Sequence, residues 1–377
     1  MRIDKVSRKL ISVALYLDSI DPGAVSELWI SPALKKELKA DVPKEIDLDK
    51  LSFELNSEIT LLLDKERKAY LSAVAKSIIF QITEVLENRQ SSFADFNKHC
   101  FGIMVRRASD VDIKRLDDRI IDLENRLRMT RYEVIEKNLA DRRSLTRIFS
   151  DNLATASEKL PPFLQLPDEA KFSVSTTSRK PWSAFNKHTA PFTSELILNK
   201  DVSFTNLDLL QLAAHEGFGG HHTELSLKDN LLMREERGEH GIVITFSPQT
   251  FISEAIAESA YQIFEVNPAT REAMLLWYYN RLLMAVQNIA TYLHFDDGRD
   301  KKEVRTELEG MDIREEDLDQ AIGFATDKRY GRYAHVYFAA FNFMTDLYRK
   351  TEDKEALLRR VYTRPVTPNM LLSSHLA

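Results

Sequence analysis

The chain has 377 residues, a length that suits either two ordinary domains or one large helical domain. Hydrophobic residues make up 44% of the chain and charged residues 29%, the balance of an ordinary globular protein. The formal net charge of -6 gives no electrostatic basis for binding nucleic acid, so we expect no such partner.

A single cysteine, Cys100, rules out an internal disulfide and favours a reducing, cytoplasmic location. The N-terminal residues enter an amphipathic helix at once, and charges at Arg8, Lys9 and Asp18 interrupt it, so we expect no signal peptide. No uninterrupted apolar run approaches the roughly 18 residues of a membrane span, so we expect no membrane partner. The low glycine content, 11 residues, indicates a mainly helical protein.

Residues 1–155 are expected to form an N-terminal helical region, because apolar residues recur there at helical spacing. The apolar positions of three successive segments are Ile11, Val13, Ala14 and Leu17; Leu55, Ile59, Leu62 and Leu63; and Leu71, Val74, Ile78, Ile79 and Ile82. Residues 110–147 are densely charged, with apolar residues at helical spacing, which indicates a long, solvated helix of a hairpin.

A second region, 156–377, begins with a segment that breaks the helical pattern. Prolines interrupt any helix over residues 156–204, and the short runs 172–175 and 196–199 have strand character. We interpret this segment as a small β-element with an edge strand near 193–199, beside a cleft where an extended ligand could pair. A connecting loop with incidental strand propensity is the alternative.

From residue 205 onward the sequence is helical again, and the two regions are expected to share one cleft. Asn206 is the expected N-cap of the first helix. The expected helices span 205–219, 221–236, 249–265, 268–294, 300–309, 315–326, 328–350 and 353–361.

The segment HEGFGGHH, residues 215–222, holds three of the nine histidines. On an ideal helix His215 and His221 are separated by about 600°, which places them on nearly opposite faces. His215 and His222 are separated by about 700°, nearly the same face but two turns away. Neither pair chelates one ion from a regular helix. Two glycines at 219–220 remove this objection, because they can break the helix and swing the next residue back.

The second informative segment, SEAIAES at residues 253–259, reads as a buried helix with Glu254 and Glu258 one turn apart. Buried carboxylates are costly unless they are paired or coordinated, and pairing with arginines is the alternative for this segment taken alone. Two imidazoles and a downstream carboxylate make a three-ligand zinc site with one open position. A glutamate beside the first histidine can then act as general base.

The two segments resemble the H-E-x-x-P-G-H-H and E-G-W-x-x-Y-x-E signatures of the family called domain of unknown function 885, which is grouped with zincin-type metallopeptidases. The resemblance covers about residues 90–360, but only these two motifs are specific. It implies that His215, His221 and Glu254 are the zinc ligands and that Glu216 is the general base. His222 matches a more variable family position and is the second choice.

The chain departs from the family pattern at several positions near the proposed ligands. Gly219 stands in place of the family's proline, Ala255 and Ile256 replace glycine and tryptophan, and Ser259 occupies the tyrosine position. These changes spare the proposed ligands and alter the surroundings in which a substrate would be recognised.

Other polar groups could complete such a site. Tyr333 and Tyr337 lie on one helical face and are expected to face the substrate, with an aromatic core stripe as the alternative. Arg332 is a candidate for binding a substrate carboxylate, which would suit a carboxypeptidase. His294 is either an outer hydrogen-bonding partner of the site or an ordinary helix-end histidine.

Together these features predict a mainly α, multi-helical, zincin-like metallopeptidase with a small β-element beside the cleft. Zinc, one Zn²⁺ per chain, is the default metal for this ligand set, and the substrate is expected to be a peptide or a small amide. Two alternatives remain open. One is a non-catalytic helical interaction protein, with or without a stabilising metal. The other is a zinc hydrolase that acts on a non-peptide amide.

Overall fold

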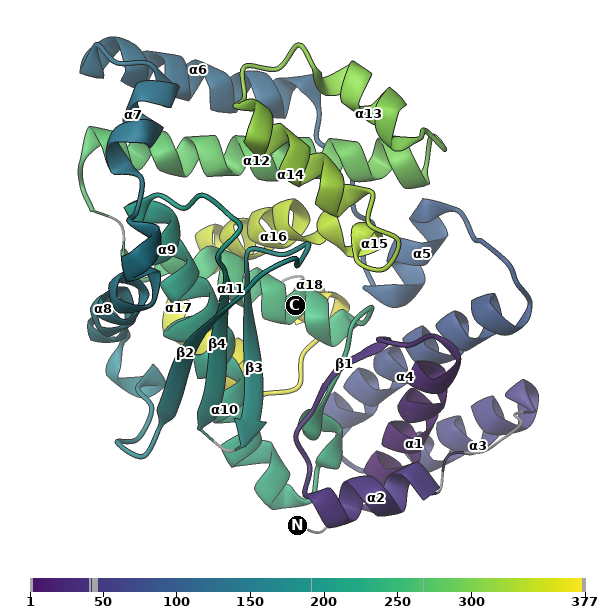
Figure 1. Ribbon diagram of the computed structural model, residues 1–377. Helices are drawn as coiled ribbons and strands as arrows, with labels where there is room; N and C mark the ends of the chain where they lie inside the picture. The colour runs from purple at the N-terminus through teal and green to yellow at the C-terminus, as the bar shows by residue number, and fades with distance from the viewer. Residues whose placement is uncertain (1–2, 41, 43–46, 191, 267, 375–377) are drawn as a thin grey trace.

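The computed structural model describes residues 3–40, 42, 47–190, 192–266 and 268–374, and this part of the chain is mainly helical with two small sheets (Figure 1). The expected mainly α class is therefore confirmed, whereas the finer zincin-type assignment stays a prediction. Three hydrophobic clusters form the interior of this described part.

Four helices near the N-terminus surround one of these clusters, at the lower right of Figure 1. Within it, the apolar face expected in the first helix is buried, including Ile11, Ala14 and Leu17. The helices are α1 (Lys5–Ile20), α2 (Pro32–Ala40), α3 (Leu48–Thr60) and α4 (Lys65–Leu86).

Helix α4 is long and apolar enough to cross a membrane when judged by length and composition alone. Its 18-residue window has a mean hydropathy of 1.3, and half of that window is buried inside the protein. Tyr70, Val74 and Ile78 of this helix belong to the N-terminal cluster. Burial in this core accounts for its apolar face, and the absence of a membrane partner stays a prediction.

The largest hydrophobic cluster joins residues 93–164 to residues 207–371, so it crosses the boundary expected near 155. Its elements include the stacked helices at the top of Figure 1. The helices that contribute residues to this cluster include α5 (Phe93–Cys100), α6 (Asp110–Leu127), α7 (Arg131–Asn138), α11 (Pro248–Ile263), α12 (Arg271–Phe295), α13 (Lys301–Leu308), α14 (Glu315–Ala325), α15 (Gly331–Ala334), α16 (Val336–Lys350), α17 (Lys354–Thr363) and α18 (Pro368–Ser374).

The charged segment 110–147 is not one long helix, contrary to the expectation. Helix α6 ends at Leu127, and Arg128 follows in the left-handed conformation, with φ of 55°. Thr130 then caps α7 through a reciprocal capping box with Glu133. The sequence therefore ends one helix and begins another within this segment, and the pattern of charged residues does not show where.

Three strands form the small β-element: β2 (Lys171–Thr177), β3 (Ala184–Ala190) and β4 (Thr193–Asn199). Their order is β2-β4-β3, with β4 parallel to β2 and antiparallel to β3. The expectation of an edge strand near 193–199 is wrong, because both neighbours pair with β4 and make it the central strand. The edge nearest the histidine segment is β3, which the sequence pattern did not predict.

The third hydrophobic cluster lies between this sheet and two helices, α8 (Leu145–Glu158) and α9 (Asn206–Leu212). Another helix, α10 (His221–Leu232), contacts both β3 and β4. Short 3-10 turns complete the chain: η1 (Arg142–Ser144), η2 (Pro162–Leu164), η4 (Met233–Glu235) and η5 (Gly238–Gly241).

A second, two-stranded sheet connects the N-terminal helices to the rest of the molecule. In it β1 (Val25–Leu28) pairs antiparallel with β5 (Ile242–Ile244). The register shifts between Val25 and Glu27, and such a bulge re-aims the side chains beside it. The shift matters because Glu27 reaches toward the edge strand β3.

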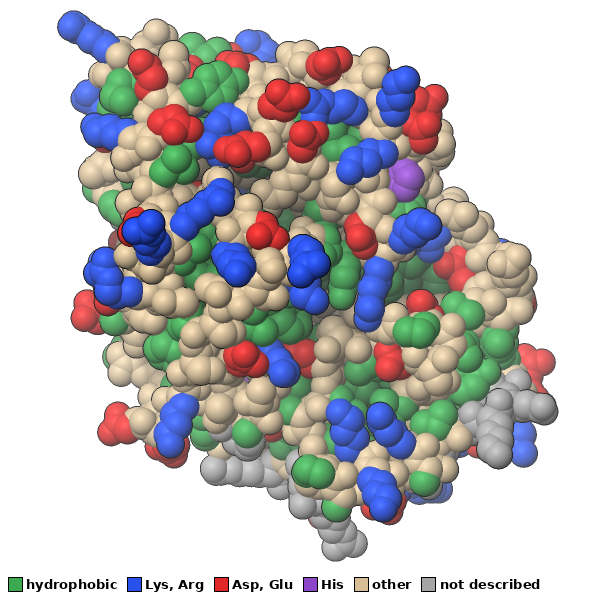
Figure 2. All heavy atoms as spheres, in the orientation of Figure 1, with side chains coloured by type: hydrophobic (Ala, Val, Ile, Leu, Met, Phe, Trp, Pro, Cys, Tyr) green, Lys and Arg blue, Asp and Glu red, His purple; other side chains and the backbone are tan. Residues whose placement is uncertain are grey.

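Acidic and basic side chains are interspersed over the face shown in Figure 2. This mixture agrees with the small net charge of the chain, and the face displays no broad field of one sign.

Candidate metal centre

The histidine segment follows helix α9, whose N-cap is Thr205. The Thr205 hydroxyl accepts the N–H of Asp208, and the Asp208 carboxylate accepts the N–H of Thr205. The expected cap, Asn206, is wrong by one residue, because Thr205 supplies the capping oxygen. Helix α9 continues into a π-helical turn, η3 (Ala213–Gly217), which carries His215 and Glu216. Such turns are rare and are frequent at functional sites.

The glycine pair ends this turn. Gly219 has a φ of 103°, a left-handed conformation that glycine adopts without strain. Gly220 packs so closely that a Cβ there would lie 1.7 Å from the carbonyl oxygen of His215. A new helix, α10, then starts at His221. The ring centroids of His215 and His221 are consequently 4.9 Å apart, although a regular helix would hold them on opposite faces.

Three side chains converge at this break. One ligand atom each from His215, His221 and Glu254 lies within 4.8 Å of the others. The Nε2 of His215 lies 3.5 Å from Oε2 of Glu254, and the Nε2 of His221 lies 3.7 Å from Oε1 of Glu254. Because Glu254 comes from α11, the two informative segments of the sequence meet in space.

These donors fit a zinc ion. Two imidazoles and one carboxylate, with room for a fourth ligand, form a common catalytic zinc set. The Oε2 atom of Glu254 is buried and has no hydrogen-bond partner among the described residues, which is unfavourable unless a cation satisfies it. Burial raises the pKa of Glu254 to about 8. A bound cation would favour the charged carboxylate and offset that effect.

Each imidazole is held through its other nitrogen. The Nδ1 of His215 lies 3.3 Å from Oε1 of Glu258, and the Nδ1 of His221 lies 3.0 Å from the hydroxyl of Ser253. Such partners fix the orientation of a ligand ring and leave Nε2 directed at the metal. Glu258, a secondary candidate for the site, therefore supports the candidate ligand His215.

Arg281 of α12 holds Glu258 from the other side. Its Nη2 donates to Oε2 of Glu258 over 3.1 Å. Burial alone would raise the pKa of Glu258, but its contacts with His215 and Arg281 lower it. The alternative of arginine pairing thus holds for Glu258, whereas the described contacts of Glu254 are to histidines and to Tyr333.

Glu216 lies beside the cluster, with its side chain nearly buried. Its Oε1 atom is 4.0 Å from Nε2 of His215, so the carboxyl group faces the side where the ligand atoms meet. Burial raises the pKa of Glu216, which suits a group that exchanges a proton near neutral pH. Asn186 of β3 donates to the backbone carbonyl of Glu216 over 2.6 Å and fixes this turn to the edge strand.

The two expected tyrosines reach the cluster but occupy different positions. The hydroxyl of Tyr333 donates to Oε1 of Glu254 over 2.8 Å, so Tyr333 orients a candidate ligand. The ring of Tyr337 lies 6.5 Å from that of His215, and its hydroxyl has no hydrogen-bond partner among the described residues. Burial raises the pKa of both hydroxyls, so each keeps its proton and can donate it in a hydrogen bond.

Three secondary candidates lie apart from the three converging side chains, and His294 occupies the helix-end position that was one of its two expected alternatives. His222 is fully buried and turns toward β4, where its Nδ1 lies 2.8 Å from the hydroxyl of Ser194. His294 lies at the end of α12 and contacts a backbone carbonyl of the following turn at 2.7 Å. Arg332 stacks on Phe96 at 4.7 Å and lines a separate cavity.

The sequence motifs did not predict a chain of polar side chains that lies behind His221. Ser253 donates to Oε2 of Glu224 over 2.5 Å, and Lys228 donates to Oε1 of the same carboxylate over 2.6 Å. Glu224 lies three residues after His221 on one helix. A search for carboxylates at i+3 and i+4 from each histidine would have found it.

Glu27 is a further missed residue, and it comes from the N-terminal strand β1. Its Oε2 accepts the backbone N–H of His188 in the edge strand over 2.7 Å. Burial, with a smaller contribution from the nearby charge of Glu216, raises the pKa of Glu27 to about 8. No local pattern could have predicted this approach, because it depends on the pairing of β1 with β5.

No family model and no curated protein matches this chain. Two solved structures resemble it in fold. One is described as a "putative lipoprotein" from Colwellia psychrerythraea, with 15% identity, a TM-score of 0.55, and coverage of 86% of this chain and 66% of that one. The other is a "putative lipoprotein of unknown function" from Shewanella oneidensis, with 12% identity, a TM-score of 0.56, and coverage of 99% and 73%. The chain therefore spans about two thirds to three quarters of their lengths, and the similarity shows the fold alone.

Proposed function

We propose that this chain is a zinc-dependent hydrolase that cleaves a peptide bond or a similar small amide. One observation carries the proposal: one ligand atom each from His215, His221 and Glu254 converges within 4.8 Å, beside the buried carboxyl group of Glu216, and Oε2 of Glu254 has no hydrogen-bond partner among the described residues. The resemblance of the two motifs to a zincin-type family supports the same reaction.

A bound zinc ion would supply Lewis acidity and lower the pKa of a coordinated water. The chain's own residues would do the rest. Glu216 accepts the proton of the attacking water and passes it to the leaving nitrogen. The hydroxyl of Tyr337, which has no partner among the described residues, donates a hydrogen bond to the substrate's carbonyl oxygen as negative charge develops there. Tyr333 keeps the carboxylate of Glu254 in position.

The structural relatives leave the reaction open, since one is described as a protein of unknown function. The cytoplasmic location is a prediction from the single cysteine. Fractionation of cells that express the tagged chain, followed by detection in soluble and membrane fractions, tests this location. Recovery mainly in the membrane fraction would contradict a cytoplasmic location.

Hydrolysis of a peptide library by the zinc-loaded chain tests the proposed reaction. We expect cleavage that a chelator abolishes and added zinc restores. A zinc-loaded chain that cleaves neither peptides nor small N-acyl amides, but loses thermal stability when the metal is removed, would point to the non-catalytic interaction protein. Cleavage of N-acyl amides without cleavage of peptides would identify the non-peptide hydrolase.

A further inference from the structure

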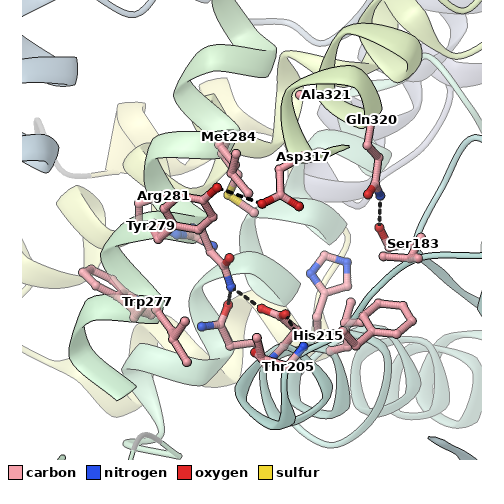
Figure 3. A pocket seen from close by; sticks show the side chains of 18 of the residues that line it. Ser183, Thr205, His215, Trp277, Tyr279, Arg281, Met284, Asp317, Gln320 and Ala321 are labelled. Atoms are coloured by element: carbon pink, nitrogen blue, oxygen red, sulfur yellow. Dashed lines mark hydrogen bonds between the residues drawn. The ribbon is translucent and has the colours of Figure 1, made fainter. Parts of the chain in front are cut away.

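A cavity of about 230 Å³ opens directly beside the candidate metal centre. Figure 3 shows it between α12, which contributes Trp277 and Arg281, and α14, which contributes Asp317 and Gln320. His215 lies at the floor of this view, and Glu258 also lines the cavity. A substrate group placed in this cavity would therefore lie next to His215, one of the three candidate ligands.

Arg281 is the unusual side chain of this cavity. It is only 7% exposed, and its Nη2 donates to the carboxylate of Glu258. The Nε and Nη1 atoms are buried and have no hydrogen-bond partner among the described residues. Buried arginine donors are normally satisfied, so two unsatisfied donors on a side chain that lines this cavity make Arg281 the candidate to bind the acceptors of a ligand.

Other charged residues of the lining are already paired within the protein. The guanidinium of Arg314 donates to both carboxylate oxygens of Asp317, over 2.8 and 2.9 Å. Asp208 accepts from Asn280 over 2.7 Å and from the backbone of Thr205. Among the described residues of this lining, Arg281 is therefore the cation with N–H donors that have no partner. An anion is the ligand that would match these donors.

The position of Arg281 is fixed relative to the candidate metal centre. Its Nη2 lies 3.1 Å from one oxygen of Glu258, and the other oxygen of Glu258 lies 3.3 Å from Nδ1 of His215. The flat face of the guanidinium packs on Phe341, 4.3 Å from the ring centroid. Only one side chain separates the guanidinium from a metal ligand, so an anion bound here would lie close to the reacting bond.

The rest of the cavity suits an apolar group. Leu276, Trp277 and Met284 contribute to its lining. A carboxylate beside an apolar side chain is the chemistry of the C-terminal residue of a peptide, or of an N-acylated amino acid.

We propose that Arg281 recognises a substrate carboxylate, so that the scissile amide joins an acyl group to a C-terminal amino acid with an apolar side chain. This inference rests on the proposed hydrolase function for its reaction, but the binding site itself can be tested without turnover. It also replaces Arg332, the arginine expected from the sequence, because Arg332 stacks on Phe96 and lines a different cavity.

Calorimetric titration of the zinc-loaded chain with N-acetylphenylalanine and with its carboxamide tests the proposal. We expect the carboxylate to bind about 10- to 100-fold more tightly than the carboxamide, because charge-assisted hydrogen bonds are the difference between the two ligands. This preference should disappear in Arg281→Met and persist in Arg332→Met, the matched control. Arg281→Lys should weaken it, since lysine keeps the charge but lacks the fixed pair of donors.

Three results would overturn the proposal: equal affinity for the two ligands, no binding of either at millimolar concentration, or a preference that survives in Arg281→Met. Circular dichroism and zinc content show whether each variant is folded and loaded, and Arg281→Lys still tests the proposal if Arg281→Met does not fold. A chain that binds the carboxylate through Arg281 but hydrolyses no amide would refute the hydrolase and leave the binding site intact. The two failures are therefore distinguishable.

Discussion

The carbonyl oxygen of His215 lies so close to Gly220 that a Cβ at position 220 would come within 1.7 Å of it. This contact joins the two halves of the histidine segment. It brings the end of the π-helical turn against the residue before α10, and so returns His221 to the side of His215. The glycine is therefore a geometric requirement of the candidate metal centre.

Replacing Gly220 by alanine should disrupt this arrangement. The added methyl group meets backbone atoms, which cannot rotate away, so we expect a loss of more than about 2 kcal/mol of stability. Zinc binding should fall with it, because the two histidines separate. Thermal denaturation and elemental analysis measure the two effects. Gly310→Ala is the control and should change neither, since a Cβ there meets no atom within 4 Å. A zinc-binding Gly220→Ala protein of normal stability would contradict the argument.

The sequence could predict the proximity of the ligand residues because their signals are local. The motif 215–222 contains the two candidate histidine ligands, the proposed base and the glycines, and the motif 253–259 contains both carboxylates. Helical periodicity shows that His215 and His221 need a break between them, and the glycines show where it can occur. These inferences need no knowledge of the rest of the chain.

The surroundings of the site could not be predicted in this way. Strand β1 pairs with β5 across more than 200 residues, and no local propensity records such a pairing. The role of β3 as the edge strand depends on which neighbour β4 accepts on each side. Arg281 lies in the middle of a long apolar helix, where its sequence neighbours give no sign that it meets Glu258.

The metal itself is tested by replacing the first histidine. Elemental analysis of the purified chain should find about one zinc per molecule, as expected for a three-ligand site. His215→Ala should lose it, because one imidazole Nε2 and the contact with Glu258 disappear together. His294→Ala is the matched control and should keep its zinc, because His294 contacts a backbone carbonyl at the end of α12. Equal zinc content in the two variants would rule out the proposed ligand set.

Replacing Glu216 by glutamine separates catalysis from metal binding. The amide has the same shape but cannot accept a proton, so we expect kcat to fall by about 10²- to 10⁴-fold. The zinc content should stay that of the wild-type chain, because Glu216 is not one of the three converging ligands. Steady-state kinetics with the best peptide substrate and elemental analysis provide both readouts. A variant that turns over normally would refute the role of Glu216 as general base.

The two tyrosines should behave differently when each is replaced by phenylalanine. Tyr333→Phe removes the 2.8 Å hydrogen bond to Glu254, and loss of such a ligand-orienting partner typically weakens metal affinity by about 10- to 100-fold. Tyr337→Phe removes a hydroxyl without a partner in the described structure. It should leave zinc affinity unchanged and lower kcat by about 10²- to 10³-fold. Competition with a zinc chelator, together with kinetics at saturating zinc, distinguishes the two effects. The same change in both variants would argue against the division of roles.

Glu27 should make the stability of the chain depend on pH. Its pKa is raised to about 8 in the folded protein, mainly by burial, whereas an unfolded glutamate has a pKa of about 4.3. Between these values the folded state holds a proton that the unfolded state releases, so stability falls as the pH rises toward 8. Glu27→Gln lacks this titration. Thermal denaturation at pH 5.5 and 8.5 should therefore show that the stability of Glu27→Gln, relative to that of the wild type, is higher at pH 8.5 than at pH 5.5. The exposed Glu352→Gln should follow the wild type at both. If the difference between Glu27→Gln and the wild type is the same at the two pH values, the Glu27 carboxyl is not held protonated at the edge of β3.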